Sequence, residues 1–346
     1  MSFSLAQVEQ LSGFDAVIDV RSPSEFAQDH IYGAVNYPVL NDEQRVEVGT
    51  LHKNHVFEAR RLGAAYISRN MGELLQTVFA KHDKSWRPLI YCWRGGMRSG
   101  SAAHIMSQIG WRVHQLQGGY KSYRRWVLTQ MEALPGQLNF IVICGPTGSG
   151  KSLFLNSLAA QGHQVLDLEA LARHRGSLLG LLPGDVQPSQ RYFETCLVHE
   201  LQQFDPKRPV FIESESKRIG YITLPTMLFE KMHQSACMEL SVPLDERIRF
   251  LCKDYRFYIE SPQLLLDKIK RLAPYRSKRE IQNWLDLIER GAFPELIKEL
   301  LEEHYDPLYQ RSMHKHYAQL ANAQKLVLDQ LDENVLGDIA RGFIYR

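Results

Sequence analysis

Short, almost continuously apolar segments alternate with amphipathic segments along most of the chain. The clearest apolar segments are residues 14–20, 89–91, 139–144, 164–168 and 209–212. Runs of this length, bounded by Gly, Pro and polar residues, are typical of parallel strands buried on both faces. The amphipathic segments between them predict helices. The pattern therefore predicts an α/β protein with parallel sheets.

The chain is long enough for two domains and shows a boundary near residues 131–138. One hydrophobic core seldom supports 346 residues. The boundary segment contains a Pro-Gly pair between a helical pattern and a new strand, which is typical of a loop between domains. We expect a first domain over residues 1–130 and a second over residues 138–346. From about residue 243 long amphipathic helical patterns replace the strand signals and predict a helical C-terminal extension.

The composition is that of a globular protein and leaves few special classes open. The apolar fraction is 44% and the charged fraction 23%, while the net charge of +2 gives no global signal for nucleic acid or membrane. Five widely spaced cysteines without a CxxC pair indicate reduced thiols, not a disulfide or zinc framework. No secretion signal is apparent, and no apolar stretch reaches the roughly 18 residues of a membrane span. We expect a cytoplasmic protein.

A cysteine loop follows the strand predicted at residues 89–91. A thiol there faces loop N–H groups and the positive end of the next helix, so we expect its thiolate to be stabilised. Two glycines let the backbone bend around an anion, and two arginines add positive charge. A buried, inert thiol is the alternative. The loop residues assigned to this site are Cys92, Trp93, Arg94, Gly95, Gly96, Met97 and Arg98, with Cys92, Arg94 and Arg98 as catalytic candidates.

A phosphate loop follows the strand predicted at residues 139–144. The segment GPTGSGKS matches the pattern GxxxxGK[ST], with a strand before it and a helix after it. Its backbone amides can cradle a diphosphate, Lys151 can reach the outer oxygens, and Ser152 could hold Mg²⁺. The phosphate-binding candidates here are Gly145, Thr147, Gly148, Ser149, Gly150, Lys151 and Ser152.

Charged residues after two later strands are candidates to complete that site. Arg173 and Arg175 follow the strand predicted at residues 164–168, near the sheet edge where open α/β sheets bind ligands. Arginines there can stabilise charge on a leaving diphosphate. Glu213 ends the strand predicted at residues 209–212, where P-loop proteins place an acidic group near the metal or attacking group. A solvated basic turn and an ordinary strand-end carboxylate are the alternatives.

Three separated blocks in residues 5–126 resemble the rhodanese family. They are IDVRSPSEFAQDHIYGAVNYPV, CWRGGMR and LQGGYKSYRRW, in the order found in that family. The resemblance implies a rhodanese-like domain whose loop cysteine carries sulfur or selenium. Residues 41–75 depart from a minimal rhodanese and include Arg60 and Arg61. A solvated helical face is one explanation of this insertion, and substrate contact beside the cysteine loop is the other.

The complete chain resembles the bacterial tRNA 2-selenouridine synthase family. The later blocks DLEALARHRGS, QPSQRYFE and ESESKRIG and the order of the two domains carry this resemblance. It implies an N-terminal rhodanese-like parallel-sheet domain followed by a P-loop NTPase-like α/β domain. It also implies an enzyme that prenylates the wobble 2-thiouridine of tRNA with geranyl diphosphate, then replaces the geranylated sulfur with selenium from selenophosphate.

On this resemblance, Lys151 and nearby arginines would stabilise the leaving diphosphate, and Cys92 would handle selenium. No tightly bound cofactor is expected besides a possible Mg²⁺. An ATP-dependent tRNA sulfurtransferase or kinase-like enzyme is the main alternative. A non-catalytic, phosphate-responsive binding module is a third possibility, which the intact cysteine loop disfavours.

A tRNA partner, bound through its anticodon region, requires a basic surface. Residues 247–279 carry ten cationic and three acidic side chains, with aromatic residues between them. These aromatics could stack on unpaired bases, or they could belong to a core beneath a charged exterior. The candidates for tRNA contact are Arg60, Arg61, Arg256, Arg271, Arg276, Lys278 and Arg279.

Overall fold

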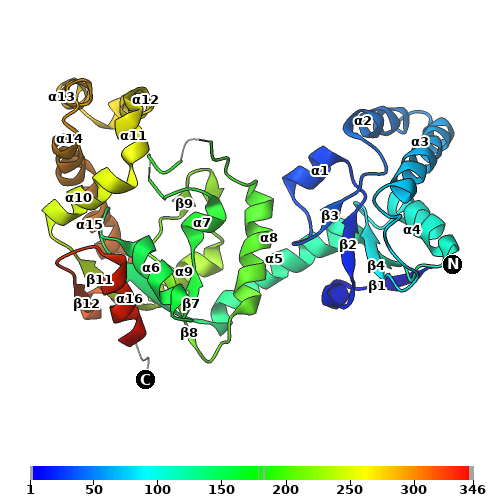
Figure 1. Ribbon diagram of the computed structural model, residues 1–346, viewed down its shortest axis with the longest axis horizontal. Helices are drawn as coiled ribbons and strands as arrows, with labels where there is room; N and C mark the ends of the chain where they lie inside the picture. The colour runs from blue at the N-terminus through cyan, green and yellow to red at the C-terminus, as the bar shows by residue number, and fades with distance from the viewer. Residues whose placement is uncertain (1–2, 178, 182–183, 343–346) are drawn as a thin grey trace. The chain divides into compact units, whose positions relative to one another are not determined.

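The computed structural model describes residues 3–177, 179–181 and 184–342, which divide into two compact units. The first unit runs to Met131 and includes Ser189–His199, and the second contains Glu132–Pro188 and the chain from Glu200 onward. Helices α5 (Gly119–Gln137) and α8 (Gln190–Gln203) therefore each have residues in both units (Figure 1).

The first unit is built on a five-stranded parallel sheet. Its strands, in spatial order, are β1 (Ser4–Ala6), β5 (His114–Leu116), β4 (Pro88–Tyr91), β2 (Ala16–Asp19) and β3 (Val35–Asn36). Ile18, Leu89 and Ile90 are fully buried in the central strands. The strands predicted from the apolar runs at residues 14–20 and 89–91 are confirmed. The remaining elements before α5 are η1 (Val8–Gly13), α1 (Pro23–Gln28), α2 (Asp42–Leu51), α3 (Val56–Gln76) and α4 (Met97–Ile109).

The insertion at residues 41–75 forms the helix pair α2 and α3. Ala59, Ile67 and Met71 form part of the buried face of α3, at helical spacing. Arg60 and Arg61 lie on its exposed face. The prediction of a solvated helical face is confirmed, and contact of these arginines with a substrate stays a prediction.

The second unit contains another five-stranded parallel sheet. Its spatial order is β12 (Gln324–Val327), β11 (Ala236–Ser241), β6 (Asn139–Cys144), β8 (Pro209–Glu213) and β7 (Gln164–Leu166). The three strands predicted in this half, β6, β7 and β8, are confirmed. A short antiparallel hairpin, β9 (Arg218–Ile219) and β10 (Ile222–Thr223), follows β8. Helices α6 (Lys151–Ala160), α7 (Leu168–Ala172) and α9 (Thr226–Gln234) connect the strands.

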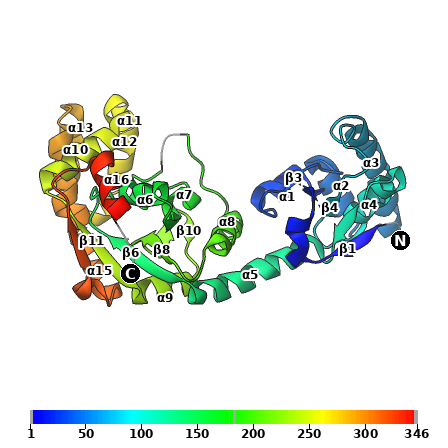
Figure 2. The ribbon, with the colours of Figure 1, turned by 60° about the horizontal axis from the view of Figure 1, so that its bottom comes forward.

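The region after residue 243 is mostly helical, as predicted, and among the described residues it also contains a strand that the sequence pattern did not indicate. The chain returns to the sheet as β12 and ends the described part with α16 (Glu333–Gly342), which packs on α6 (Figure 2). β12 is a largely exposed edge strand of sequence QKLV, so it lacks the apolar run that marks a buried strand. The helices before it are α10 (Leu244–Asp254), α11 (Arg256–Glu260), α12 (Pro262–Lys270), η2 (Ala273–Tyr275), α13 (Lys278–Glu289), α14 (Phe293–Glu299), the π-helix η3 (Leu300–Tyr305), α15 (Asp306–His316) and η4 (Leu320–Asn322).

The segment predicted as a domain boundary, residues 131–138, contains the division between the two units, after Met131, and the end of helix α5. Helix α5 continues through Pro135 to Gln137, and β6 begins two residues later. Pro135 lies in the last turn, where the missing N–H affects one helical hydrogen bond, and its ring is buried. Packing of the ring therefore offsets part of the usual cost of an interior proline.

Two further sequence predictions concern the whole chain. All five cysteines lie in the described residues, and none of them is joined to another by a disulfide bond. Within the described residues, no helix is both long enough and apolar enough to cross a membrane.

Candidate functional site

Cys92 is buried at the end of β4, directly before the loop that leads into α4. The Ser99 hydroxyl donates a hydrogen bond to Cys92 Sγ at 3.1 Å. The amide of Gln115 in turn donates to Ser99 Oγ at 2.7 Å. Because an amide nitrogen can only donate, Ser99 must accept from Gln115, which leaves its own proton for Cys92 Sγ or for the more distant Gly96 carbonyl at 3.4 Å. This pair of bonds is suited to stabilising negative charge on Cys92.

The cysteine loop is held in a narrow turn against the start of α5. The carbonyl of Cys92 accepts from the Tyr120 amide at 2.8 Å, and that of Trp93 accepts from the Lys121 amide at 3.0 Å. Gly95 has a φ of +65°, and a Cβ there would lie 2.8 Å from the Leu116 carbonyl oxygen. Only glycine meets both requirements, which explains one of the two glycines predicted to shape the loop.

The two arginines of this loop have different surroundings. Arg98 Nη1 binds Glu25 Oε2 at 2.6 Å, and both side chains are largely buried. Although burial opposes it, this guanidinium holds the pKa of Glu25 below its usual value. Arg94 is exposed, and Met97, which opens α4, is 57% exposed. Arg94 is therefore the loop cation available to an incoming anion, while the charge of Arg98 is partly neutralised by an acid that the sequence analysis did not single out.

The phosphate loop connects β6 to α6, as predicted. Lys151 Nζ donates to the carbonyl oxygens of Gly145 at 2.9 Å and Pro146 at 3.4 Å. Gly148 has a φ of +78°, and a Cβ there would lie 2.8 Å from Leu251 Cδ1. The side chain of Leu251, from α10, therefore packs closely on the loop only because residue 148 is glycine.

A buried arginine clamps this loop to the helical region. Arg247 Nε donates to the Thr147 carbonyl at 2.9 Å, and its two terminal nitrogens bind both carboxylate oxygens of Asp306 at 2.9 and 2.7 Å. Arg247 is 5% exposed. Although Arg247 belongs to the basic segment of residues 247–279, its side chain fixes the position of the phosphate loop and is not part of an exposed basic surface.

Three carboxylates lie beside Ser152. Ligand atoms of Glu169, Glu213 and Glu215 are all within 4.8 Å of one another, and Ser152 Oγ donates to Glu169 at 3.2 Å. Glu213 Oε1 accepts from the Glu169 amide at 3.1 Å, while its Oε2 is buried without a hydrogen-bond partner among the described residues. Glu213, the one member assigned from sequence, therefore belongs to a cluster with two acids that sequence reasoning missed.

Burial raises the pKa of each of the three carboxylates. Burial, and then repulsion from Glu169, raises the pKa of Glu215 to about 8. The same causes raise the pKa of Glu213 well above its usual value, and burial raises that of Glu169. One buried and two half-buried acids at this separation cannot all carry charge without a cation or protons.

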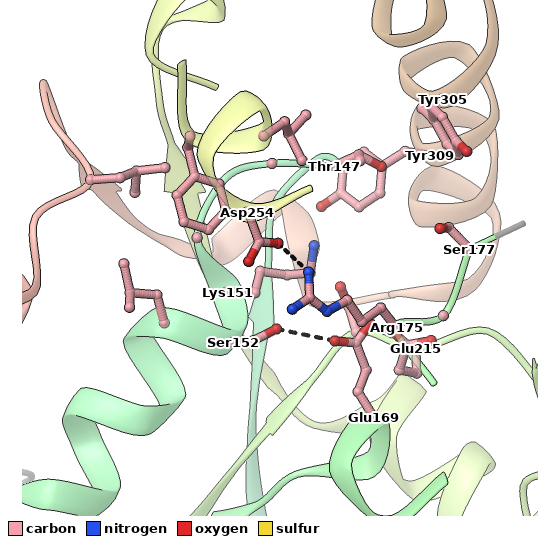
Figure 3. A pocket seen from close by; sticks show the side chains of 18 of the residues that line it. Thr147, Lys151, Ser152, Glu169, Arg175, Ser177, Glu215, Asp254, Tyr305 and Tyr309 are labelled. Carbon is pink, nitrogen blue, oxygen red and sulfur yellow. Dashed lines mark hydrogen bonds and ion pairs between the residues drawn. The ribbon is translucent and has the colours of Figure 1, made fainter. Parts of the chain in front are cut away.

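A cavity of about 1360 Å³ lies above the phosphate loop and this cluster (Figure 3). Arg175 lines it, forms an ion pair with Asp254, and lies over the Tyr255 ring at 5.2 Å. Arg173 is exposed and does not line the cavity, so the prediction that it joins this site is not supported by its position. The predicted phosphate-site residues that line the cavity are Thr147, Gly148, Gly150, Lys151, Ser152 and Arg175.

Other predicted residues support the cavity from beneath. Gly145, Ser149 and Glu213 are not part of its lining. Ser149 and Glu213 are fully buried, and a Cβ at Gly145 would lie 3.2 Å from the carbonyl oxygen of Leu240.

The basic segment at residues 247–279 separates into structural and exposed residues. Tyr258 is 3% exposed, and Tyr255 and Phe257 pack against the same helical core, so these three rings are not free to stack on bases. Tyr275 is 77% exposed.

Of the arginines and lysines in this segment that are proposed to contact tRNA, some have side-chain partners and others are exposed. Arg256 is paired with Glu260, and Arg276 Nη2 lies 2.9 Å from His304 Nδ1. Arg271, Lys278 and Arg279 are exposed.

Comparison with known proteins adds an independent line of evidence. The rhodanese-like domain family model matches residues 4–125, and the model of the tRNA 2-selenouridine synthase AAA domain matches residues 138–290. The tRNA 2-selenouridine synthase of Sulfurovum sp. is 31% identical, over 90% of this chain and 93% of its own length. The chain belongs to the tRNA 2-selenouridine synthase family. The family assignment and the two-domain fold made from the sequence are thereby confirmed.

Two more members of the tRNA 2-selenouridine synthase family support this assignment. The protein of Nitrosomonas europaea is 36% identical over 77% of this chain and 70% of its own length. That of Bdellovibrio bacteriovorus is 31% identical over 87% of this chain and 89% of its own length. Membership in a family of synthases makes the chain an enzyme.

Proposed function

We propose that this enzyme converts the wobble 2-thiouridine of tRNA to 2-selenouridine in two steps at two sites. The observation that carries the proposal is the presence of a complete phosphate loop and a separate buried cysteine loop in one member of this family. Each loop suits one anionic co-substrate, geranyl diphosphate at the phosphate loop and selenophosphate at the cysteine loop. A tRNA-modifying enzyme of this kind would work in the cytoplasm.

The first step is transfer of the geranyl group to the 2-thio sulfur. The sulfur attacks the first carbon of the prenyl chain, and the carbon–oxygen bond breaks as diphosphate departs with the electron pair. A thiocarbonyl sulfur is already a good nucleophile, so the protein contributes mainly by stabilising the leaving group. Lys151, the loop amides and Arg175 are the groups positioned for that task.

A divalent cation fits the carboxylate cluster beside the phosphate loop. The buried, unpartnered Glu213 Oε2, together with Glu169 and Glu215, offers the hard oxygen ligands that Mg²⁺ prefers. Ser152 lies next to them through its bond to Glu169. When bound, the cation would neutralise charge on the diphosphate.

The second step replaces the geranylated sulfur with selenium at the Cys92 loop. Arg94 is exposed at this loop and can attract selenophosphate. Cys92 then acts as the selenium-handling nucleophile: its thiolate attacks C2 of the base and geranyl thiol leaves, the selenium of selenophosphate displaces Cys92 from C2, and water cleaves the selenium–phosphorus bond to release phosphate. The Ser99 hydroxyl stabilises charge on the sulfur of Cys92. Prenylation activates the base for this exchange, so the product of the first site is the substrate of the second.

Ligand-dependent thermal stability distinguishes this function from an ATP-dependent enzyme. We expect geranyl diphosphate to raise the melting temperature, since a ligand at about 100 times its Kd stabilises the folded state by roughly 2.7 kcal/mol. The measurement is a thermal melt of the full chain with geranyl diphosphate, ATP or GTP, with Lys151→Ala as the control. Stabilisation by a nucleoside triphosphate alone would favour the sulfurtransferase or kinase-like alternative.

Exposed basic residues at the start of α13 are expected to contact the tRNA backbone. Replacing Lys278 and Arg279 together by alanine should weaken tRNA binding and lower the magnitude of the slope of log K against log salt by about 1.4 to 1.8, because each phosphate contact contributes roughly 0.7 to 0.9. Binding is measured by filter retention across a salt series. The control is Arg290→Ala with Lys298→Ala, which removes the same charge from other exposed positions. Equal slopes for the two double variants would place the tRNA elsewhere.

A further inference from the structure

A second, smaller cavity adjoins the phosphate loop in the helical part of the second unit. It measures about 60 Å³, several times the roughly 10–15 Å³ that one buried water needs. Five residues line both this cavity and the large one: Thr147, Ser177, Leu251, Tyr255 and Tyr305. Thr147, Ser177 and Tyr305 can be seen bordering the large cavity in Figure 3. The small cavity, called here the apolar pocket, therefore begins where the phosphate loop ends.

Beyond the hydroxyl-bearing residues that it shares with the large cavity, Thr147, Ser177, Tyr255 and Tyr305, the apolar pocket offers almost no polar groups. Apart from the five shared residues, it is lined by Leu179, Tyr258, Ile259, Leu265, Phe293, Leu296, Ile297, Leu300 and Leu301. The only polar side-chain atom among these nine is the Tyr258 hydroxyl, which donates to the Leu179 carbonyl at 3.2 Å. A nucleobase is recognised by hydrogen bonds to its edges, and these nine residues do not supply them. A hydrocarbon chain requires none.

The pocket and the phosphate loop are held at a fixed position relative to each other. Arg247 joins the Thr147 carbonyl to Asp306, next to η3, which supplies Leu300, Leu301 and Tyr305 to the pocket wall. Leu251 fits against Gly148 on the other side. An apolar void in a well-packed core is destabilising unless something fills it. A ligand with an anionic head in the loop and an apolar tail in the pocket would fill both.

We propose that the apolar pocket binds the hydrocarbon chain of a prenyl diphosphate whose diphosphate group occupies the phosphate loop. This inference rests on the function proposed above and adds the determinant of its specificity. The diphosphate alone cannot distinguish a prenyl donor from a nucleotide, because both present the same charged group to Lys151. The apolar walls make that distinction, and the depth of the pocket sets the preferred chain length.

The test fills the pocket and measures affinity for ligands that share the head group. Leu265, 5% exposed on α12, lines the pocket, while the adjacent Leu264 is 45% exposed and does not. In Leu265→Phe the Kd for geranyl diphosphate should rise about tenfold or more, because two or more methylene groups lose their apolar contact. The Kd for inorganic diphosphate and for the shorter dimethylallyl diphosphate should change less than twofold. Leu264→Phe should behave as wild type.

Titration calorimetry on the full chain gives these constants, and a thermal melt checks folding. Ile297→Phe, at a partly exposed wall position, serves as the second variant if Leu265→Phe does not fold. Suppose that the wild type binds geranyl diphosphate more tightly than inorganic diphosphate. If a folded pocket variant then keeps the wild-type affinity for geranyl diphosphate, the assignment of the hydrocarbon chain to this pocket is wrong, while the proposed donor is not affected. Without that preference the proposed donor is also wrong. Equal losses for ADP and geranyl diphosphate would assign the pocket to a nucleotide.

Discussion

Replacing Cys92 by serine is expected to abolish selenium incorporation and to leave prenylation of the tRNA at the wild-type rate. Loss of a catalytic nucleophile lowers the rate of its step by about 1000-fold or more. Serine preserves the size of the side chain and can still accept the hydrogen bond from Ser99, so the loop should keep its shape. Prenylated tRNA should therefore accumulate. Mass spectrometry of nucleosides from tRNA incubated with geranyl diphosphate and selenophosphate measures both products.

A matched thiol variant makes this result specific. Cys252→Ser removes another free, partly buried cysteine that lines neither cavity, and we expect both steps to continue at the wild-type rate. If Cys92→Ser stopped prenylation as completely as selenation, the two loops would serve one reaction centre. The division of labour between the two loops would then be wrong.

Much of the fold could be predicted because its central strands are buried on both faces. The run Asn139–Cys144 is apolar after its first residue, and the observed β6 has the same bounds. The edge strand β12 has no such run, because it pairs with β11 on one side only and is largely exposed. The exact end of α5 could not be predicted for a different reason: the effect of Pro135 depends on its place in the last turn and on packing, which the local sequence does not reveal.

The candidate site could be predicted where one short segment carries it and not where distant segments meet. The phosphate loop is such a segment. The carboxylate cluster joins Glu169, shortly after β7, to Glu213 and Glu215, which lie at and just after the end of the neighbouring strand β8. The carboxyl ends of adjacent parallel strands share one sheet edge, and that signal could have identified Glu169. No comparable signal exists for the Arg247 clamp, whose partners lie 100 and 59 residues away.

The matching variant at the other site, Lys151→Ala, is expected to lose prenylation by about 100- to 1000-fold, as when one charge-stabilising donor is removed from an active site. The bonds of Lys151 to Gly145 and Pro146 carbonyls are each worth only about 1 kcal/mol, so the variant should fold. Lys207→Ala, at an exposed position of the same unit, is the control and should prenylate normally.

Supplying the product of the first step separates the two sites most sharply. Lys151→Ala should convert tRNA that is already S-geranylated to the selenium product at the wild-type rate, because the Cys92 loop is intact and no diphosphate has to leave. Cys92→Ser should fail with the same substrate. Nucleoside analysis by mass spectrometry follows both conversions. With S-geranylated tRNA as the substrate, diphosphate has already left before the enzyme binds it. Failure of Lys151→Ala on this tRNA would therefore mean that the phosphate loop also acts in the selenium step.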